Sequence, residues 1–199
     1  MISSSAASRS DLVQIGSRNG LSLAISPRSK KSIGSVVADR TSPELISGVR
    51  IEPLQVYADD RGFFIELARL GKGLASDFTA SEGQVQASAT LSYPGTIKAI
   101  HFHYEQTDLW APIKGMLQVL LCDLRCDSPS FGRLNTLYVG QHRQWSILIP
   151  PGVGHGYKVL GNEVAMLIYL TNRFYSPEDE GRLAWDDPAI AYDWETQHK

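Results

Sequence analysis

The stretch "GTIKAIHFHYEQTDLWAPIKG", residues 95–115, places two histidines and a nearby acidic residue between two glycines. Its first half is rich in β-branched and aromatic residues, which favours a strand. Along a strand, successive side chains alternate between the two faces. Lys98 and Ile100 are then expected on one face, and His101 and His103 on the other. The pattern therefore predicts two imidazoles that project into one space.

The spacing of the polar residues in this stretch has a known counterpart. The pattern G-x5-H-x-H-x4-[acid]-x6-G fits with Asp108 as its acid, and the pattern P-x-G-x-x-H ends at His155. Both resemble the two motifs of cupin proteins, which fold as a double-stranded β-helix. In cupins, three histidines and one acid often hold a divalent metal. The resemblance implies a barrel and offers His101, His103, Asp108 and His155 as an alternative metal site.

The rest of the chain predicts more strands of the same kind. Short apolar runs separated by Gly, Pro, Asn and Asp occur at residues 48–57, 62–70, 83–93, 96–103, 116–124, 134–140, 144–152, 155–161 and 164–172. Helical periodicity is weak, and only short peripheral helices or turns are expected, within residues 176–194. We therefore predict an all-β, cupin-type jelly-roll barrel that forms a single domain over residues 46–199.

The first 45 residues differ in composition from the rest. "MISSSAASRS" and "SPRSKKSIGS" are rich in serine and basic residues, and Asp11 is the only acid before Asp39. Such a segment buries little apolar surface. Residues 1–45 are therefore expected to be a flexible extension or to lie over a partner subunit. The composition also resembles an organellar transit peptide, which stays open as an alternative.

The overall composition argues against several broad functions. The 19 Lys and Arg residues against 21 Asp and Glu residues give a net charge of -2, so no basic field favours nucleic acid or an anionic membrane. No apolar run approaches the roughly 18 residues that span a bilayer. Cys122 and Cys126 match neither a CxxC metal motif nor the disulfide framework of a secreted protein. Reduced thiols and a cytoplasmic location are therefore expected.

A closer resemblance covers the chain from about residue 48 to residue 194. "DDRGFFIE" resembles the nucleotide-binding segment D-x-R-G-x-F-x-E of the dTDP-4-dehydrorhamnose 3,5-epimerase family, and "TIKAIHFH" resembles its segment with the catalytic histidine. "CDLRCDSPSFGRLNTLYVG", "LIPPGVGHGYKVL" and "LIYLTNRFYSPEDEGRLAWDDPAIAYDW" resemble its later motifs in the same order. The chain is identified as a divergent member of that family, which is itself cupin-folded.

The resemblance implies an activity and a set of residues. The family epimerises a nucleotide-linked 4-keto-6-deoxy sugar, usually dTDP-linked, at C3, C5 or both, by proton transfer without a cofactor. The C4 ketone acidifies the neighbouring C–H bonds, so that His101 can remove a proton on one face and Tyr169 can return one on the other. A homodimer is also implied. The implied substrate-binding residues are Arg61, Phe64, Glu66, Gln86, Lys98, His155 and Tyr175.

Three positions depart from the family pattern. Lys98 replaces an arginine, Asp108 replaces a pocket lysine, and the chain lacks the downstream aspartate that orients the family's catalytic histidine. An ionised Asp108 beside an enolate would oppose catalysis. We therefore expect Asp108 to form a hydrogen bond with His101 or His103 in place of the missing aspartate. A protonated Asp108 and a metal shared with the histidines both stay open as alternatives to this bond.

His103 stands where the family usually has glutamine. A paired H-x-H resembles related 4-keto-sugar 3,4-isomerases, in which two imidazoles move protons along one face, so His103 is a catalytic candidate beside His101, Tyr169 and Asp108. Ketone migration therefore stays open as an alternative to epimerisation. A metal-dependent cupin enzyme and an inactive sugar-nucleotide-binding relative stay open as well.

Overall fold

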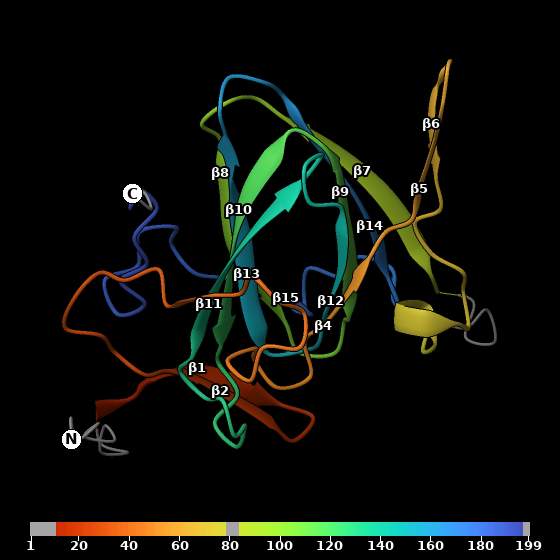
Figure 1. The fold of residues 1–199 in the computed structure, drawn as a ribbon. Helices are drawn as coiled ribbons and strands as arrows, with labels where there is room; N and C mark the ends of the chain where they lie inside the picture. Colours follow the sequence, from red (N-terminus) through yellow and green to blue (C-terminus); the bar gives the residue numbers. More distant parts are fainter. Residues whose placement is uncertain (1–10, 79–83, 197–199) are drawn as a thin grey trace.

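Two β-sheets face each other and form the walls of a barrel (Figure 1). The computed structural model describes residues 11–78 and 84–196. The six-stranded sheet contains, in spatial order, β15 (Glu180–Arg182), β8 (Ile97–His103), β13 (Val153–Leu160), β10 (Met116–Asp123), β11 (Leu134–Gly140) and β3 (Ser35–Val36). The five-stranded sheet contains β4 (Arg50–Pro53), β12 (Trp145–Ile149), β9 (Asp108–Lys114), β14 (Ala165–Thr171) and β7 (Gln86–Ser92). Two further hairpins are β1 (Val13–Arg18) with β2 (Leu21–Ile25), and β5 (Val56–Asp59) with β6 (Gly62–Ile65).

The strand pairings confirm the predicted all-β class. Every pairing in the two sheets is antiparallel except the short contact of β11 with β3. The predicted peripheral helices are absent from residues 176–194, where the structure has short turns besides strand β15; the described residues contain no α-helix, and a 3-10 helix lies at Gly73–Ala75. Within residues 176–194 the chain instead adds β15 to the sheet edge beside β8. No described helix has the length and apolar character that a bilayer crossing requires.

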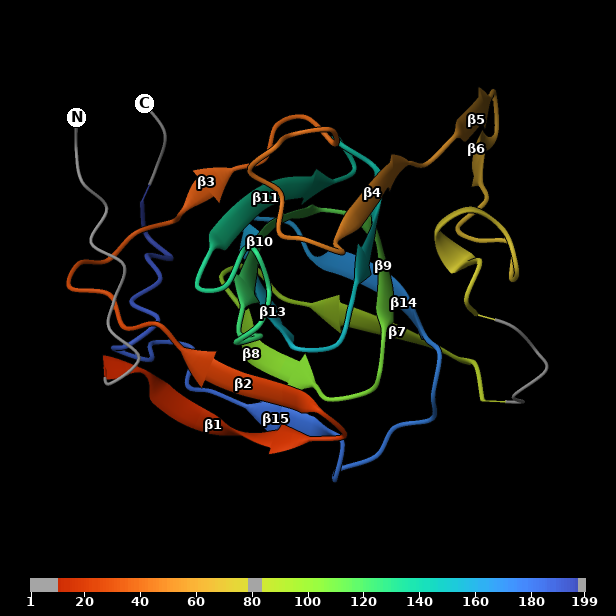
Figure 2. The ribbon, with the colours of Figure 1, turned by 90° about the horizontal axis from the view of Figure 1, so that it is seen from below.

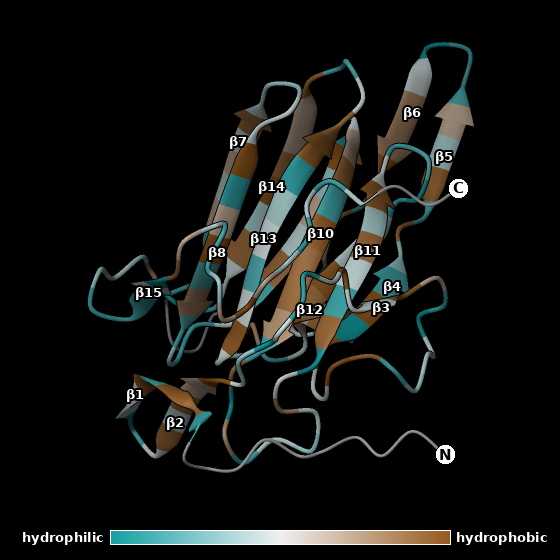
Figure 3. Ribbon diagram, turned by 90° about the vertical axis from the view of Figure 1, so that its left-hand side faces the viewer, coloured by the Kyte–Doolittle hydropathy of each residue, from teal (hydrophilic) through white to brown (hydrophobic). Residues whose placement is uncertain are grey.

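The core lies between the two sheets, where their inward side chains meet. Hydrophobic residues are concentrated on the strands (Figure 3). Leu117, Val119 and Leu121 alternate along β10 and are fully buried, as a period of two requires. Each such side chain contributes about 1.5–3 kcal/mol by leaving water. Two further apolar clusters cover the outer faces of the sheets.

Part of the N-terminal segment packs against the barrel. Within residues 11–45, the β1–β2 hairpin lies beside β15 and β8 (Figure 2), and Leu23, Ala24 and Ile25 are buried. The reason is local, because the run from Leu21 to Ile25 is apolar enough to cover the outer face of the six-stranded sheet. Residues 1–10, the serine-rich start of the segment, lie outside the described residues.

The β5–β6 hairpin extends away from the barrel (Figure 1). It carries three large aromatic residues that are mostly exposed, Tyr57 at 59%, Phe63 at 55% and Phe64 at 64%. A two-stranded hairpin is marginally stable alone in water. The exposed rings therefore mark this hairpin as a surface that a binding partner could cover.

Candidate active site

A cavity of about 200 Å³ opens between the two sheets. From the six-stranded sheet it is lined by Lys98, His101, His103, His155, Gly156, Tyr157 and Glu180. From the five-stranded sheet it is lined by Gln86, Thr90, Asp108, Trp110, Leu167, Tyr169 and Thr171, and the connecting segments add Gln106 and Tyr175. Three imidazoles thus stand on one wall of the cavity, and the Tyr169 phenol belongs to the other.

A bulge in β8 decides which side chains of that strand face the cavity. His101 pairs with His155, and Lys98 pairs with Tyr157. Between these two pairs, β8 contains one more residue than β13. A bulge turns the next side chain to the other face. Lys98 therefore lines the cavity with His101, and the predicted alternation, which placed them on opposite faces, is wrong at this point.

His101 lies next to a carboxylate from the sheet edge. Strand β15 pairs with β8, and His101 Nδ1 is 3.6 Å from Glu180 Oε2. Burial and the neighbouring His155 lower the pKa of His101 below its ordinary 6.5, while the charge of Glu180 opposes them. His101 is therefore neutral near pH 7. A neutral imidazole beside a carboxylate can accept a proton, because the carboxylate stabilises the imidazolium that forms.

Asp108 lines the cavity but does not make the hydrogen bond that the sequence predicted. Its Oδ1 accepts a hydrogen bond from Gln106 Nε2 at 2.7 Å, and its Oδ2 accepts one from Trp110 Nε1 at 3.1 Å. The nearest imidazole nitrogens, on His103 and His155, are 3.9 and 3.6 Å away. Neither distance is a hydrogen bond, so the expected bond from Asp108 to His101 or His103 is absent from this structure. Glu180 is the carboxylate beside His101.

The two inner histidines lie next to polar neighbours. His155 Nδ1 donates to the Val153 carbonyl at 3.0 Å, and burial lowers the pKa of His155 although the charge of Asp108 opposes this. Gln106 Nε2 is 3.1 Å from His103 Nε2 and can donate to it. His103 Nδ1 is buried without a hydrogen-bond partner and is 3.9 Å from Asp179 Oδ2.

The inner residues of the cavity fit a divalent metal poorly. His103, Asp108 and His155 offer donor atoms within 4.8 Å of one another, and His101 is not in this group. A tetrahedral ion with bonds of roughly 2.0–2.2 Å holds its donors about 3.3 Å apart. The carboxylate–imidazole separations of 3.9 and 3.6 Å are wider, and both Asp108 oxygens already accept hydrogen bonds. As arranged, the group is more open than a tetrahedral ion requires, and its carboxylate is already engaged by Gln106 and Trp110.

The rim of the cavity carries the other candidates for substrate contact. Lys98 Nζ donates to Thr90 Oγ1 at 2.7 Å across the cavity. Gln86 Oε1 accepts a hydrogen bond from the Tyr175 backbone N–H at 3.1 Å, which ties the segment after β14 to β7. Tyr175 is 56% exposed. Its position at the entrance is suited to stacking on a flat group of a ligand.

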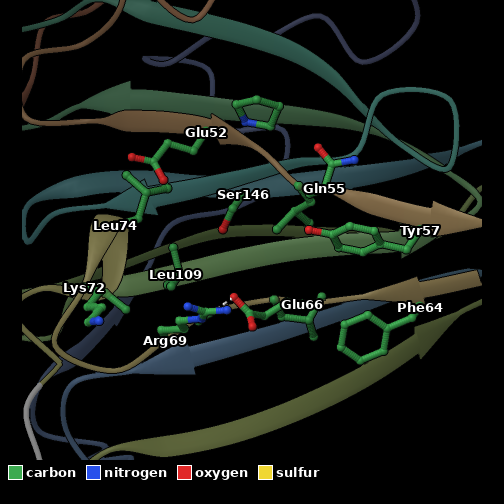
Figure 4. Close-up of a pocket in the computed structure, with 16 residues that line it drawn as sticks. Glu52, Gln55, Tyr57, Phe64, Glu66, Arg69, Lys72, Leu74, Leu109 and Ser146 are labelled. Carbon is green, nitrogen blue, oxygen red and sulfur yellow. Dashed lines mark ion pairs between the residues drawn. The ribbon is translucent and has the colours of Figure 1, made fainter.

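Three predicted substrate-binding residues lie elsewhere in the single chain. Phe64 and Glu66 line a different, larger cavity of about 560 Å³ beside the β5–β6 hairpin, where Glu66 pairs with Arg69 at 2.8 Å (Figure 4). Arg61 sits in the hairpin turn and pairs with Asp59. The structure therefore does not bring these three residues to the histidine cavity of the same chain.

The sequence missed two residues of the site. Glu180 lies beside His101 because β15 pairs with β8 in the sheet. No local sequence pattern predicts this long-range pairing. Gln106 connects Asp108 to His103 and lies in the turn between β8 and β9. A polar residue two positions before Asp108 was a visible signal, because it lies in the short turn that follows the predicted strand.

Comparison with known proteins places the chain among sugar-nucleotide enzymes. The family model described as dTDP-4-dehydrorhamnose 3,5-epimerase matches residues 43–199. The spore coat polysaccharide biosynthesis protein SpsL of Bacillus subtilis is 43% identical over 157 residues, covering 78% of this chain and 100% of SpsL. The probable low-salt glycan biosynthesis epimerase Agl13 of Haloferax volcanii is 39% identical over 156 residues, covering 76% of this chain and 96% of Agl13.

A solved structure supports the same fold. The 3,5-epimerase RmlC of Legionella pneumophila, crystallised with dTDP-4-keto-L-rhamnose, superimposes with a TM-score of 0.63 at 26% identity. The match covers 80% of this chain and 82% of that protein. The two-sheet barrel described above is thus the cupin fold of these relatives.

Proposed function

Because this chain belongs to the dTDP-4-dehydrorhamnose 3,5-epimerase family, we propose that it epimerises a nucleotide-linked 4-keto-6-deoxy sugar at C3, C5 or both. The nucleotide we propose is dTDP, the group bound in the Legionella relative. One observation carries the proposal: a neutral His101 and the Tyr169 phenol line one cavity from opposite sheets. Inversion at a carbon requires a base and an acid on opposite faces.

The proton transfers balance without a cofactor. His101 takes the hydrogen from the carbon next to the ketone, and the electrons of the broken C–H bond move to the C4 oxygen as an enolate. Glu180, 3.6 Å from His101, stabilises the imidazolium. Tyr169 then donates its hydroxyl proton to the opposite face of the same carbon, and the ketone re-forms. Solvent then takes the extra proton from His101 and returns a proton to the Tyr169 phenolate.

The charged groups around the cavity are compatible with an enolate, because hydrogen bonds partly offset the negative charge of Asp108. Lys98 is the cation on the cavity wall, and we propose that it faces the enolate oxygen or the diphosphate. Asp108 replaces a cation of the family. Its charge is partly offset, because Gln106 and Trp110 donate to its two oxygens. This keeps an ionised carboxylate compatible with an enolate elsewhere in the cavity.

The substrate is larger than the histidine cavity, so further residues must hold the nucleotide. We propose that Gln86, His155 and Tyr175 contact the bound substrate within one chain. Arg61, Phe64 and Glu66 would reach a nucleotide only in another subunit, because they lie away from their own cavity. The exposed rings on β5–β6 support this arrangement. We therefore propose a homodimer that acts in the cytoplasm, where nucleotide sugars are made and used.

Solvent exchange tests the proposal directly. The protein is incubated in deuterium oxide with dTDP-4-keto-6-deoxyglucose, and the sugar is analysed by NMR. Deuterium at C3 or C5 with inversion is expected, and a His101→Ala variant should stop it. His142→Ala is the matched control, because His142 is an exposed histidine away from the cavity.

The same spectra distinguish epimerisation from the rival functions. A ketone that moves from C4 to C3 would show 3,4-isomerisation, with His103 beside His101 on one wall as its structural basis. A sugar that binds but stays unlabelled would indicate an inactive relative. Either result would refute the proposed epimerisation.

A further inference from the structure

The β1–β2 hairpin precedes the part of the chain that matches the family model, which begins at residue 43. It is a tight hairpin, with Asn19 and Gly20 as its two turn residues and positive φ angles of 48° and 83°. An Asn-Gly pair in this conformation is typical of a type I′ turn. Because Leu23, Ala24 and Ile25 anchor the base of the hairpin in an apolar cluster, its tip has a fixed place beside the barrel.

The tip of this hairpin contacts two loops at once. Arg18 Nη1 donates to the Glu178 carbonyl at 2.5 Å, and Arg18 Nε is 3.9 Å from Glu105 Oε1. Asn19 Nδ2 also donates to the Glu105 carboxylate. Arg173 pairs with the other oxygen of Glu105 at 3.0 Å. The tip therefore bridges the loop after β8 to the segment that leads into β15.

Inside the barrel wall, the same two loops are joined at Asp179. Its carboxylate accepts the backbone N–H groups of Glu105 and Gln106 at 2.9 and 3.0 Å. The next residue along, Glu180, is the carboxylate beside His101, and Gln106 is the donor to Asp108. The joined loops therefore lie directly before Glu180, whose strand pairs with β8 beside His101.

We propose that the β1–β2 hairpin is a positioning element for the catalytic base, in which Arg18 and Asn19 clamp the two loops so that Glu180 stays beside His101. The inference rests on the proposed function for its effect on catalysis. It assigns a role to a segment outside the family match. The contacts of the tip are partly exposed, with 37% of the Arg18 side chain accessible. Surface pairs of this kind have small individual effects, so a several-fold change is expected and not a complete loss.

The test is the double variant Arg18→Ala with Asn19→Gly in the full chain. Glycine at position 19 keeps the positive φ of the turn while removing the amide. We expect kcat for deuterium wash-in to fall 3- to 10-fold with KM within twofold of wild type, and Arg18→Lys to retain part of the rate. Arg28→Ala is the control, since Arg28 belongs to the same N-terminal segment and donates to the Gly132 carbonyl, away from these loops.

A second readout needs no substrate. NMR titration of the histidine ring signals, assigned with His101→Gln, follows the pKa of His101. Glu180 raises that pKa through its charge, so the double variant should titrate at lower pH than wild type. The other groups whose charge acts on His101 are Arg182, His155 and Asp108, and the variants leave all of them in place.

The two readouts separate the possible failures. If wild type shows no wash-in, the proposed function fails, and the titration still tests the clamp. An unchanged His101 titration in a folded double variant would overturn the inference. Should the double variant unfold, Glu105→Gln tests the same bridge from the barrel side, and its unchanged titration would have the same meaning.

Discussion

The contact between His101 and Glu180 leads to a quantitative prediction for Glu180→Gln. At 3.6 Å, the separation of Nδ1 and Oε2, two unit charges interact by about 1.2 kcal/mol in water and about 4.6 kcal/mol at an effective dielectric constant of 20. The His101 side chain is 34% exposed and that of Glu180 is 11% exposed, so a value between these limits applies. We take roughly 1.4–2.7 kcal/mol, which corresponds to a 10- to 100-fold fall in kcat.

The pH profile of Glu180→Gln distinguishes this electrostatic effect from general damage. Glu180 raises the pKa of His101 against the effect of burial. Its loss should therefore lower that pKa further. The acid limb of the kcat profile, where His101 becomes protonated and stops accepting protons, is then expected at lower pH than in wild type, while the plateau rate falls.

The assay is deuterium wash-in from solvent into dTDP-4-keto-6-deoxyglucose between pH 4.5 and 8. Glu178→Gln is the matched control, because it makes the same change in charge on an exposed side chain two residues away. A plateau rate for Glu180→Gln within twofold of wild type, or an acid limb that moves to higher pH, would refute the reasoning.

Four other outcomes are expected. Asp108→Asn should lower the free energy of unfolding in urea by about 1–3 kcal/mol, since one of its two buried hydrogen-bond donors loses its acceptor; equal stability would contradict this. Because burial lowers the folded-state pKa of His101 and His155 below 6.5, the unfolded chain binds more protons just below that pH. Stability to urea should therefore fall as pH drops below about 6.5, and a flat profile would argue against buried neutral imidazoles. Elemental analysis of protein purified without chelator should show far less than one metal per chain, and EDTA should leave wash-in unchanged; a full equivalent would show that the donor distances close around an ion. Phe64→Ala should raise KM for the dTDP-sugar about 10-fold at unchanged kcat, whereas an unchanged KM would exclude Phe64 from nucleotide binding.

The barrel could be predicted because most of its strands show their pattern locally. Alternating or apolar runs between turn residues identified most strands of both walls, but not the short edge strands β3 and β15. Strand β9, Asp108–Lys114, was not predicted. It contains Pro112, and its first five residues are all buried, so it lacks the alternation of a half-exposed strand. Its place is set by pairing with β12 and β14 on either side, which no local window contains.

The N-terminal hairpin could have been predicted from its Asn19-Gly20 turn, although the average composition of the segment does not indicate it. Serine and basic residues dominate the segment, yet "VQIGSRNGLSLAI" holds an Asn-Gly pair between two runs with strand character. Average composition describes a whole segment, whereas a hairpin depends on two residues in its turn. The expectation of flexibility for residues 1–45 followed from the average.

The site was predictable in its residue types and less so in its contacts. Strand periodicity gave the shared face of His101 and His103, and the Pro-Gly turn gave the neighbourhood of His155. The bulge at Lys98 and the approach of Glu180 could not be predicted, because both depend on how β8 pairs with β13 and β15. Asp108 lines the cavity. The sequence did not predict its hydrogen-bond partners. Gln106 and Trp110 donate to its two oxygens, so neither oxygen bonds to a histidine.

Strand β15 closes the six-stranded sheet at its edge and contributes only three residues, while His101 sits on the next strand inward. A strand with one neighbour can change its length or sequence without repacking the interior. His101 therefore belongs to an inner strand of the barrel, whereas Glu180, the carboxylate that raises its pKa, lies on the edge strand. In this architecture, proton affinity can evolve independently of the residue that carries the proton.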